Sequence, residues 1–317
     1  MAVDEIALEA LRSYEDPRLG IAERFLTPTI GGMRTVGVLS TPIDRPRDIG
    51  WVLCHSFGME QVWLQPLEVA VARGLSAAGF PVLRYHAQGY GDSQASTDVA
   101  TMASQTRDAL DAVDVLVRET AIARVGLAGG RVGATIAALA AQRSDASAAI
   151  LWEPMIDGRR YVDSLLRVAS VTELGTASKL DAVPRDPQEI FARSGHMDIQ
   201  GFPLYRAVFD EMSAFELLSA LNSYRGHSLV VQISRSPKPR PELEHLVSHL
   251  NEVGGRATLG IVTDPQARGF GFQRYYATPG GQRKEDKQST MSRGIVSLTV
   301  STCVEWDDAA RERGGAG

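Results

Sequence analysis

The sequence predicts an α/β fold in which a mostly parallel central sheet is flanked by helices. Short apolar runs alternate with helical patterns over residues 50–150, an order typical of parallel strands joined by right-handed crossovers. The chain has 317 residues, of which 44% are hydrophobic and 22% are charged, and this is ample material for a large core. One α/β domain with an inserted cap therefore fits the length better than two independent domains.

Charge and composition exclude several classes of partner. The formal net charge is −5 and there is no long basic run, so we expect neither nucleic acid nor an anionic membrane surface as a partner. No apolar run is long enough to cross a bilayer, and the N-terminus lacks the apolar core of a signal peptide. Cys54 and Cys303 have no metal or redox spacing, so we expect a cytoplasmic protein without a metal or cofactor.

The beginning of the chain predicts a helix and a hairpin ahead of the parallel sheet. Residues 1–22 form an N-terminal segment in which 5–18 have the pattern of a short amphipathic helix. Two strand-like runs follow, Glu23–Pro28 and Met33–Ser40. Because Gly31-Gly32 separates them, they predict a β-hairpin.

The next segments continue the alternation of strands and helices. Gly50–His55 and Phe80–Tyr85 are short apolar runs that predict buried strands. Pro66–Gly79 predicts a helix, since its apolar residues share one face and a glycine ends it. Thr101–Thr120 predicts another helix, and Ala148–Trp152 predicts a further strand.

A strand–turn–helix segment, Val125–Ala137, lies at the centre of this pattern. An apolar run enters it, small residues fill the bend, and an alanine-rich helical pattern leaves it. Gly129 and Gly133 bracket Arg131, because a sharp strand-to-helix turn leaves no room for Cβ atoms on its flanks. A guanidinium at a helix N-terminus can bind an anion. The alternative is an arginine that only fills space.

These features resemble the α/β-hydrolase family. The central segment is similar to its G-x-S-x-G nucleophile elbow, with Arg131 in the place of the serine. His55–Gly58 is similar to the oxyanion loop after the third strand, although Ser56 replaces a glycine. His86–Ser93 is similar to the D-x-x-G-x-G-x-S turn after the fourth strand, with His86 in place of the aspartate.

A narrower resemblance covers roughly residues 50–225. The Gly-x-Arg-x-Gly elbow, the Trp-x-Pro turn at Trp152–Pro154 and the following Asp157–Tyr161 are similar to those of hydrolase-like proteins associated with exosortase systems.

The α/β-hydrolase resemblance implies a helical cap inserted after strand six. Helical patterns replace the strand rhythm over residues 155–225, which divides the core into 23–154 and 226–277. The second part of the core predicts a strand, a helix and a strand, namely Ser228–Ser234, Leu243–Val253 and Ala257–Val262.

Residues 278–317 depart from the family. They begin as a polar loop, and Gly294–Val304 then alternates apolar and polar residues like one more strand, followed by a tail. This C-terminal strand could extend the edge of the chain's own sheet, or it could pair with a second subunit and form a homodimer.

The resemblance also implies where a catalytic triad would lie. In the family an acid follows one late strand and a histidine follows the next; the corresponding turns here are Ile233–Pro237 and Thr263–Phe270. The first turn holds no carboxylate, and the sequence has no histidine after His249. We therefore expect no Ser-His-Asp mechanism in this chain.

Four polar residues end predicted parallel strands, where open α/β sheets bind ligands. His55, His86, Arg131 and Glu153 are therefore the predicted catalytic residues, and the histidines can transfer protons near neutral pH. Each has a structural alternative: His55 could bond a loop carbonyl, His86 could brace its turn, and Glu153 could pair with Arg131. The predicted substrate-binding residues are Ser56, Phe57, Gln88, Val132 and Arg268.

These residues predict an atypical enzyme acting on a small carboxylate or acyl substrate. The reaction would be acyl transfer, cyclisation, elimination or hydrolysis by directly activated water. Arg131 would anchor the anionic group, His55 or His86 would act as acid or base, and the amides of residues 56 and 57 would stabilise an oxyanion. The alternative is a non-catalytic binding or scaffold protein on the same fold.

Overall fold

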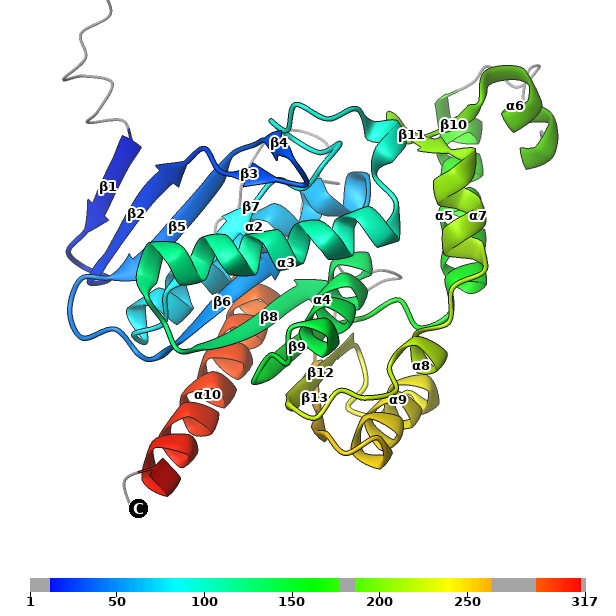
Figure 1. The fold of residues 1–317 in the computed structure, drawn as a ribbon. Coiled ribbons are helices and arrows are strands. Elements are labelled where there is room, and N and C mark those ends of the chain that lie inside the picture. Colours follow the sequence, from blue (N-terminus) through cyan, green and yellow to red (C-terminus); the bar gives the residue numbers. More distant parts are fainter. Residues whose placement is uncertain (1–11, 177–185, 264–288, 315–317) are drawn as a thin grey trace, which may run out of the picture.

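The computed structural model describes residues 12–176, 186–263 and 289–314, and a nine-stranded sheet forms its centre (Figure 1). The six strands from β7 through β6, β8, β9 and β12 to β13 pair in parallel, while β1, β2 and β5 form an antiparallel edge. In spatial order the strands are β1 (Ser13–Asp16), β2 (Ile21–Leu26), β5 (Gly37–Pro42), β7 (Val82–Tyr85), β6 (Ile49–Cys54), β8 (Arg124–Gly130), β9 (Ala148–Trp152), β12 (His227–Ser234) and β13 (Arg256–Thr263). The predicted mostly parallel sheet is confirmed.

Helices cover both faces of this sheet. On one face α2 (Met59–Ala77) packs with α10 (Ser289–Gly314), and on the other lie α3 (Met102–Thr120), α4 (Val132–Arg143) and α9 (Pro241–Glu252). Side chains alternate between the faces along a strand. In β6, Trp51 and Leu53 join the core under α2 and α10, whereas Val52 joins the core under α3 and α4. Strands buried on both faces therefore read as continuous apolar runs.

The N-terminal elements differ in part from the prediction. The expected hairpin is present as β2 paired with β5, and a short ladder of β3 (Thr29–Ile30) and β4 (Met33–Arg34) encloses the two glycines. Residues 5–11 of the predicted first helix lie outside the described residues. The remainder was predicted wrongly, because β1 is a strand whose backbone pairs with β2.

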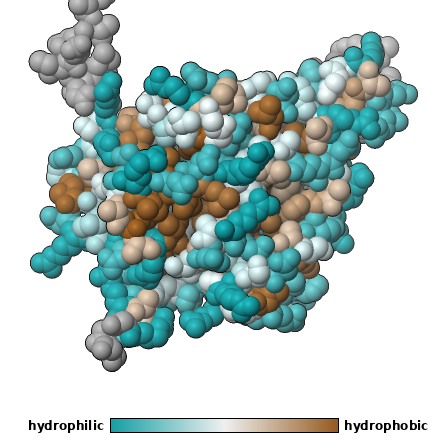
Figure 2. Space-filling model, viewed as in Figure 1, coloured by the Kyte–Doolittle hydropathy of each residue, from teal (hydrophilic) through white to brown (hydrophobic). Residues whose placement is uncertain are grey.

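Figure 2 shows mostly hydrophilic side chains on this view of the molecule, with a hydrophobic patch near the C-terminal half of α3.

Helix α2 begins earlier than predicted. It starts at Met59, after Gly58 with φ 57°, and contains Pro66, which the sequence placed at the helix start. Proline removes one helical hydrogen bond. The helix continues through it because residues on both sides, such as Leu64 and Leu67, are fully buried against the sheet.

The predicted C-terminal strand over residues 294–304 is wrong, because these residues belong to helix α10 (Figure 1). Ile295, Thr299, Cys303 and Asp307 recur every fourth residue and are at most 2% exposed, so the buried face follows a helical period. The strand through which a homodimer was expected to form is therefore a helix instead.

The segment between β9 and β12 extends from the sheet as the predicted cap (Figure 1). It is mostly helical but also contains a hairpin that the sequence did not predict, with Gln200 and Gly201 both at positive φ in its turn. Its elements are α5 (Gly158–Thr176), α6 (Pro187–Ser194), β10 (His196–Ile199), β11 (Phe202–Tyr205), α7 (Arg206–Ser213) and α8 (Leu217–Ala220), and a 3-10 turn, η1 (Thr97–Val99), precedes α3 in the core.

The carboxylate of Glu211 connects the cap to the core through hydrogen bonds. Glu211 on α7 accepts hydrogen bonds from the backbone N–H groups of Met102, at 2.8 Å, and Ala103, at 3.0 Å, which open α3. We expect Glu211→Gln to lower the free energy of unfolding by about 1 kcal/mol, since a helix N-terminus loses its negative partner. Thermal melting and limited proteolysis of the cap measure this effect. Glu189→Gln, at an exposed residue of α6, is the control, and equal effects of the two changes would contradict the role of Glu211.

Candidate functional site

The bend between β8 and α4 has the geometry of a strained elbow. Arg131 lies at its apex with φ 56° and ψ −121°, a conformation that L-residues adopt at a cost of about 1–3 kcal/mol. A Cβ atom on Gly129 would lie 2.5 Å from the backbone of Gly133, and one on Gly133 would lie 2.3 Å from the carbonyl oxygen of Cys54. Both flanking positions therefore require glycine, as the sequence predicts.

The side chain of Arg131 is directed into the protein and is paired. The residue is 7% exposed, and its Nε donates to Oε1 of Glu60 at 3.1 Å. Its Nη1 donates to the backbone oxygen of Glu153 at 3.2 Å, and its Cζ lies 5.4 Å from the ring centre of Tyr161. Burial by itself lowers the pKa of Arg131, but the adjacent Glu60 carboxylate outweighs burial and raises this pKa.

Glu60, which the sequence reasoning missed, is the centre of a buried network. It lies in the first turn of α2, is 4% exposed, and its Oε2 accepts hydrogen bonds from Ser56 Oγ and Tyr161 OH, both at 2.9 Å. The network thus joins the loop after β6, the elbow and the cap. The only sequence signal was an acidic residue two positions after the loop glycine Gly58.

The Glu153 side chain does not form the ion pair with Arg131 that was the structural alternative for this residue. The Glu153 carboxylate pairs with Arg240 and accepts the backbone N–H of Ile233, so it ties the end of β9 to the β12 segment. Only its backbone oxygen contacts Arg131. The backbone of Glu153 has a positive φ of 49°, and its side chain extends to Arg240.

His55, at the end of β6, forms a second buried pair. Its Nδ1 lies 2.6 Å from Oε2 of Glu68 on α2, and the two side chains are 7% and 1% exposed. Among the described residues, Nε2 of His55 is buried without a hydrogen-bond partner. Burial alone lowers the pKa of His55, but the Glu68 carboxylate outweighs burial and raises it. Glu68 was another residue that the sequence reasoning missed.

His86 lies beside this pair, with its ring centre 5.9 Å from that of His55. Its Nδ1 accepts the backbone N–H of Asp92 at 3.0 Å, so it braces its own turn as one alternative expected. Burial first, and the charge of His55 second, lower the pKa of His86. The pKa of His55 is therefore above the ordinary value for histidine and the pKa of His86 is below it. His55 consequently retains its proton more readily than His86 does.

The other predicted binding residues have structural contacts. Phe57 packs edge-on to Tyr90 with ring centres 6.4 Å apart, and Val132 is buried at the start of α4. Gln88 turns toward α3, where its backbone and side-chain N–H groups donate to Asp108 at 2.7 and 2.8 Å. Arg268 lies outside the described residues.

The structure thus assembles two adjoining groups at the predicted end of the sheet. Ser56 and Arg131 meet at Glu60, and His55 and His86 meet beside Glu68. The groups adjoin because His55 and Ser56 are consecutive. Within the described parts of the chain, no three histidine, cysteine or carboxylate side chains are placed to hold a metal ion. No helix among these residues is long and apolar enough to span a membrane.

Comparisons with known proteins place this geometry in a known fold. A family model described as serine aminopeptidase, S33, matches residues 51–198. The curated protein Esterase EstD of Thermotoga maritima is 30% identical over 128 residues, which are 38% of this chain and only 31% of that protein's length.

Among solved structures, Est1E from Butyrivibrio proteoclasticus superimposes with a TM-score of 0.57 and 15% identity, covering 90% of this chain and 98% of that one. The Pyrococcus furiosus esterase PF2001 has a TM-score of 0.55 and 16% identity, with 79% and 85% coverage. The chain therefore has the α/β-hydrolase fold, and the predicted fold class is confirmed.

Proposed function

We propose that this chain is an atypical α/β-hydrolase-fold enzyme that acts on a small acyl or carboxylate substrate without a covalent serine intermediate. The observation that carries this proposal is the arginine at the apex of the elbow, held by a buried carboxylate. A guanidinium remains protonated in proteins and has no lone pair available for attack. The sequence supports the same conclusion, because no histidine follows His249 to serve as the base of a serine triad.

The acid–base chemistry is assigned to His55. Glu68 orients its ring through Nδ1, which leaves Nε2 as the atom that would exchange a proton with substrate or water. A buried nitrogen without a hydrogen bond is unfavourable, so a substrate or water that reaches it gains that interaction. His86 stays neutral more readily and would shield His55 from solvent. The amides of residues 56 and 57 would face a developing oxyanion.

The pairing of Arg131 refines the expected substrate. Because Glu60 balances its charge, Arg131 attracts a free carboxylate less strongly than an isolated guanidinium would. A neutral acyl carbonyl, replacing the Glu153 backbone oxygen as an acceptor, avoids repulsion from Glu60. Acyl groups are therefore favoured over free carboxylates, and the accessible reactions are transfer, cyclisation, elimination or hydrolysis by activated water.

The first test uses active-site labelling. We expect no stoichiometric reaction with a fluorophosphonate probe and no hydrolysis of 4-nitrophenyl esters above the background of denatured protein, because no activated serine is present. A serine esterase of the same fold, labelled in parallel, is the positive control. Arg131→Ser should also remain unlabelled, since the acid and base of a triad are missing. Stoichiometric labelling of any serine in the unmodified chain would overturn the proposal.

A second candidate function is a non-catalytic binding or scaffold protein. The observation in its favour is that the Arg131–Glu60 pair is satisfied within the protein, with side chains only 9% and 6% exposed. The two functions differ at His55, because a catalyst needs a titratable group at the bound molecule and a receptor does not. If a metabolite that co-purifies with the protein is identified by mass spectrometry, the enzyme converts it and His55→Gln abolishes that conversion. Binding that persists without conversion indicates the receptor.

A further inference from the structure

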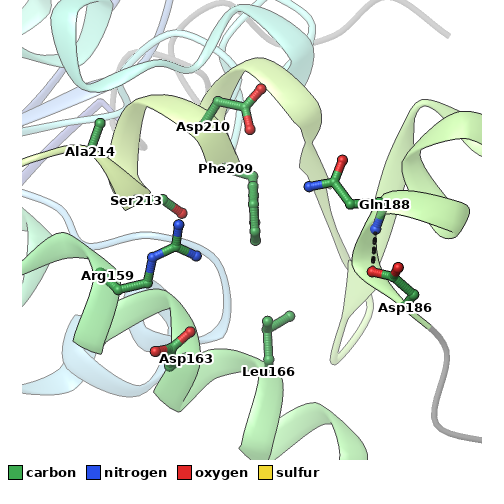
Figure 3. A pocket seen from close by; sticks show the side chains of 9 residues that line it. All are labelled: Arg159, Asp163, Leu166, Asp186, Gln188, Phe209, Asp210, Ser213 and Ala214. Carbon is green, nitrogen blue, oxygen red and sulfur yellow. Dashed lines mark hydrogen bonds between the residues drawn. The ribbon is translucent and has the colours of Figure 1, made fainter.

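A further set of buried charged side chains lies between α2 and the strands β2, β7 and β6. It differs from the charges that line a groove in the cap, where Arg159 and Asp163 lie one turn apart on α5 and are both exposed (Figure 3). Water screens exposed charges, whereas buried charges act on one another strongly. The charges beneath α2 are therefore the ones that can influence a neighbouring site.

These buried side chains form a row of alternating sign. Arg73 on α2, whose side chain is 41% exposed, donates to Oε2 of Glu23 on β2 at 2.6 Å. Arg84 on β7 lies 3.5 Å from the other oxygen of Glu23. Burial lowers the pKa of Arg84, and the carboxylates of Glu23 and Glu68 partly offset this. Because Glu68 contacts Nδ1 of His55 at 2.6 Å, the row leads from the surface to the proposed acid–base residue.

Two polar atoms in the middle of the row have hydrogen-bonding capacity to spare. Within the described residues, Oε1 of Glu68 and Nε of Arg84 are buried and make no hydrogen bond. One atom is an acceptor and the other is a donor, and a buried polar atom without a partner is unfavourable. The side chains of Glu68 and Arg84 are only 1% and 14% exposed. Glu68 can therefore be held by His55 at one oxygen and by Arg84 at the other.

We propose that Arg84 is a positioning residue for the acid–base chemistry of His55 and acts through Glu68. This inference rests on the proposed function, in which Nε2 of His55 exchanges a proton with substrate or water. In that exchange the proton leaves or joins Nε2, while the proton on Nδ1 remains donated to Oε2 of Glu68. Arg84 supplies a counter-charge for Glu68 while His55 is neutral, so the ring keeps its orientation in both charge states. Glu23 balances Arg84 in turn.

The titratable groups that face His55 come from α2, from β7 and from the turn after β7, namely Glu68, Arg84, Tyr85 and His86. Burial raises the pKa of Tyr85 and lowers that of His86, so both are neutral near pH 7. Glu68 and Arg84 are therefore the charges that act on His55. Burial lowers the pKa of His55, Glu68 raises it, and Arg84 lowers it.

Titration of the His55 ring by nuclear magnetic resonance tests the proposal without any substrate, and His55→Gln identifies the signal. Arg84→Gln removes a positive charge near the ring, so at fixed pH the ratio of protonated to neutral His55 should rise on the order of fivefold. Glu23→Gln should have the opposite effect, because it removes the anion that balances Arg84. Arg84→Lys keeps the charge and should titrate like the unmodified protein.

The control and the stability of each variant separate this role from a purely structural one. Arg24→Gln is the matched control, because Arg24 follows Glu23 on β2 but is 51% exposed and pairs with Glu119. A structural row would lower stability in urea without moving the titration of His55, and that result would overturn the proposal. If Arg84→Gln does not fold, Glu23→Gln decides, and an unchanged or increased protonated fraction would overturn it.

Conversion of the co-purifying metabolite by the unmodified protein distinguishes this inference from the proposed function. Expected shifts of His55 without conversion contradict the proposed function and leave the control of His55 by Arg84 supported. Conversion with an unshifted His55 in both variants overturns the role of Arg84 alone.

Discussion

Replacing Glu60 by glutamine is expected to lower the free energy of unfolding by about 3 kcal/mol, because it leaves a buried guanidinium without its counter-charge. Glutamine keeps the size of the side chain and can still accept from Ser56 and Tyr161, so the loss reports the charge of the carboxylate. Urea unfolding followed by circular dichroism measures it. By the same argument Arg131→Ser should also lower stability, because it leaves the buried Glu60 carboxylate without its counter-charge.

Two controls separate the ion pair from other effects. Glu119→Gln removes a carboxylate from a pair with Arg24, whose side chain is 51% exposed, and should change stability by less than about 1 kcal/mol. The double variant Glu60→Gln with Arg131→Gln should lose less than the sum of the single changes, because neither charge then remains buried alone. Additive losses would show that the two residues do not stabilise each other.

Asp307→Asn is the second change with a large expected effect, about 2 kcal/mol, because a buried carboxylate loses its charge-assisted hydrogen bonds. Asp307 is 2% exposed and lies on the buried face of α10, where three arginines contact it. Arg47 does so at 2.7 Å, Arg124 at 2.5 Å and Arg311 at 2.8 Å. The substitution removes the carboxylate that links α10 to Arg47 before β6 and to Arg124 at the start of β8, so α10 should detach from the sheet before the rest of the chain unfolds. Hydrogen exchange of the α10 amides measures this directly.

The pH dependence of stability provides an independent test of how much the charge of Asp307 stabilises the fold. Burial raises the pKa of its carboxyl, but hydrogen bonds from Arg47 and Arg124 outweigh burial and hold this pKa below its usual value. A depressed pKa contributes stability above the ordinary pKa of aspartate, and this contribution disappears as the pH falls through about 4 and below. The wild type should therefore lose more stability than Asp307→Asn over that range. Parallel acid titrations would contradict the prediction, and Asp308→Asn, at an exposed neighbour, is the control.

The sequence by itself determined the sheet and the elbow. Strand β9 has the predicted bounds, and the bounds of β6, β8 and β12 lie close to the predicted ones. These strands could be predicted because a strand that is buried on both faces has a continuous apolar run in its sequence. The elbow was readable because Gly129 and Gly133 have no sterically acceptable substitute. The strand runs depend on residues that are neighbours in sequence, whereas the glycines are recognisable because a sharp strand-to-helix bend recurs with the same spacing.

Only the tertiary structure decided how the charges pair and how the C-terminus folds. Arg131 pairs with Glu60, His55 with Glu68, and Glu153 with Arg240, and none of these partners is adjacent in sequence. The sequence offers several carboxylates for each cation. Which carboxylate forms the ion pair depends on which one the tertiary fold places next to that cation. In residues 294–304 the apolar pattern fits a strand as well as a helix. Packing against α2 selects the helix, because only a helical period buries Ile295, Thr299 and Cys303 on one face.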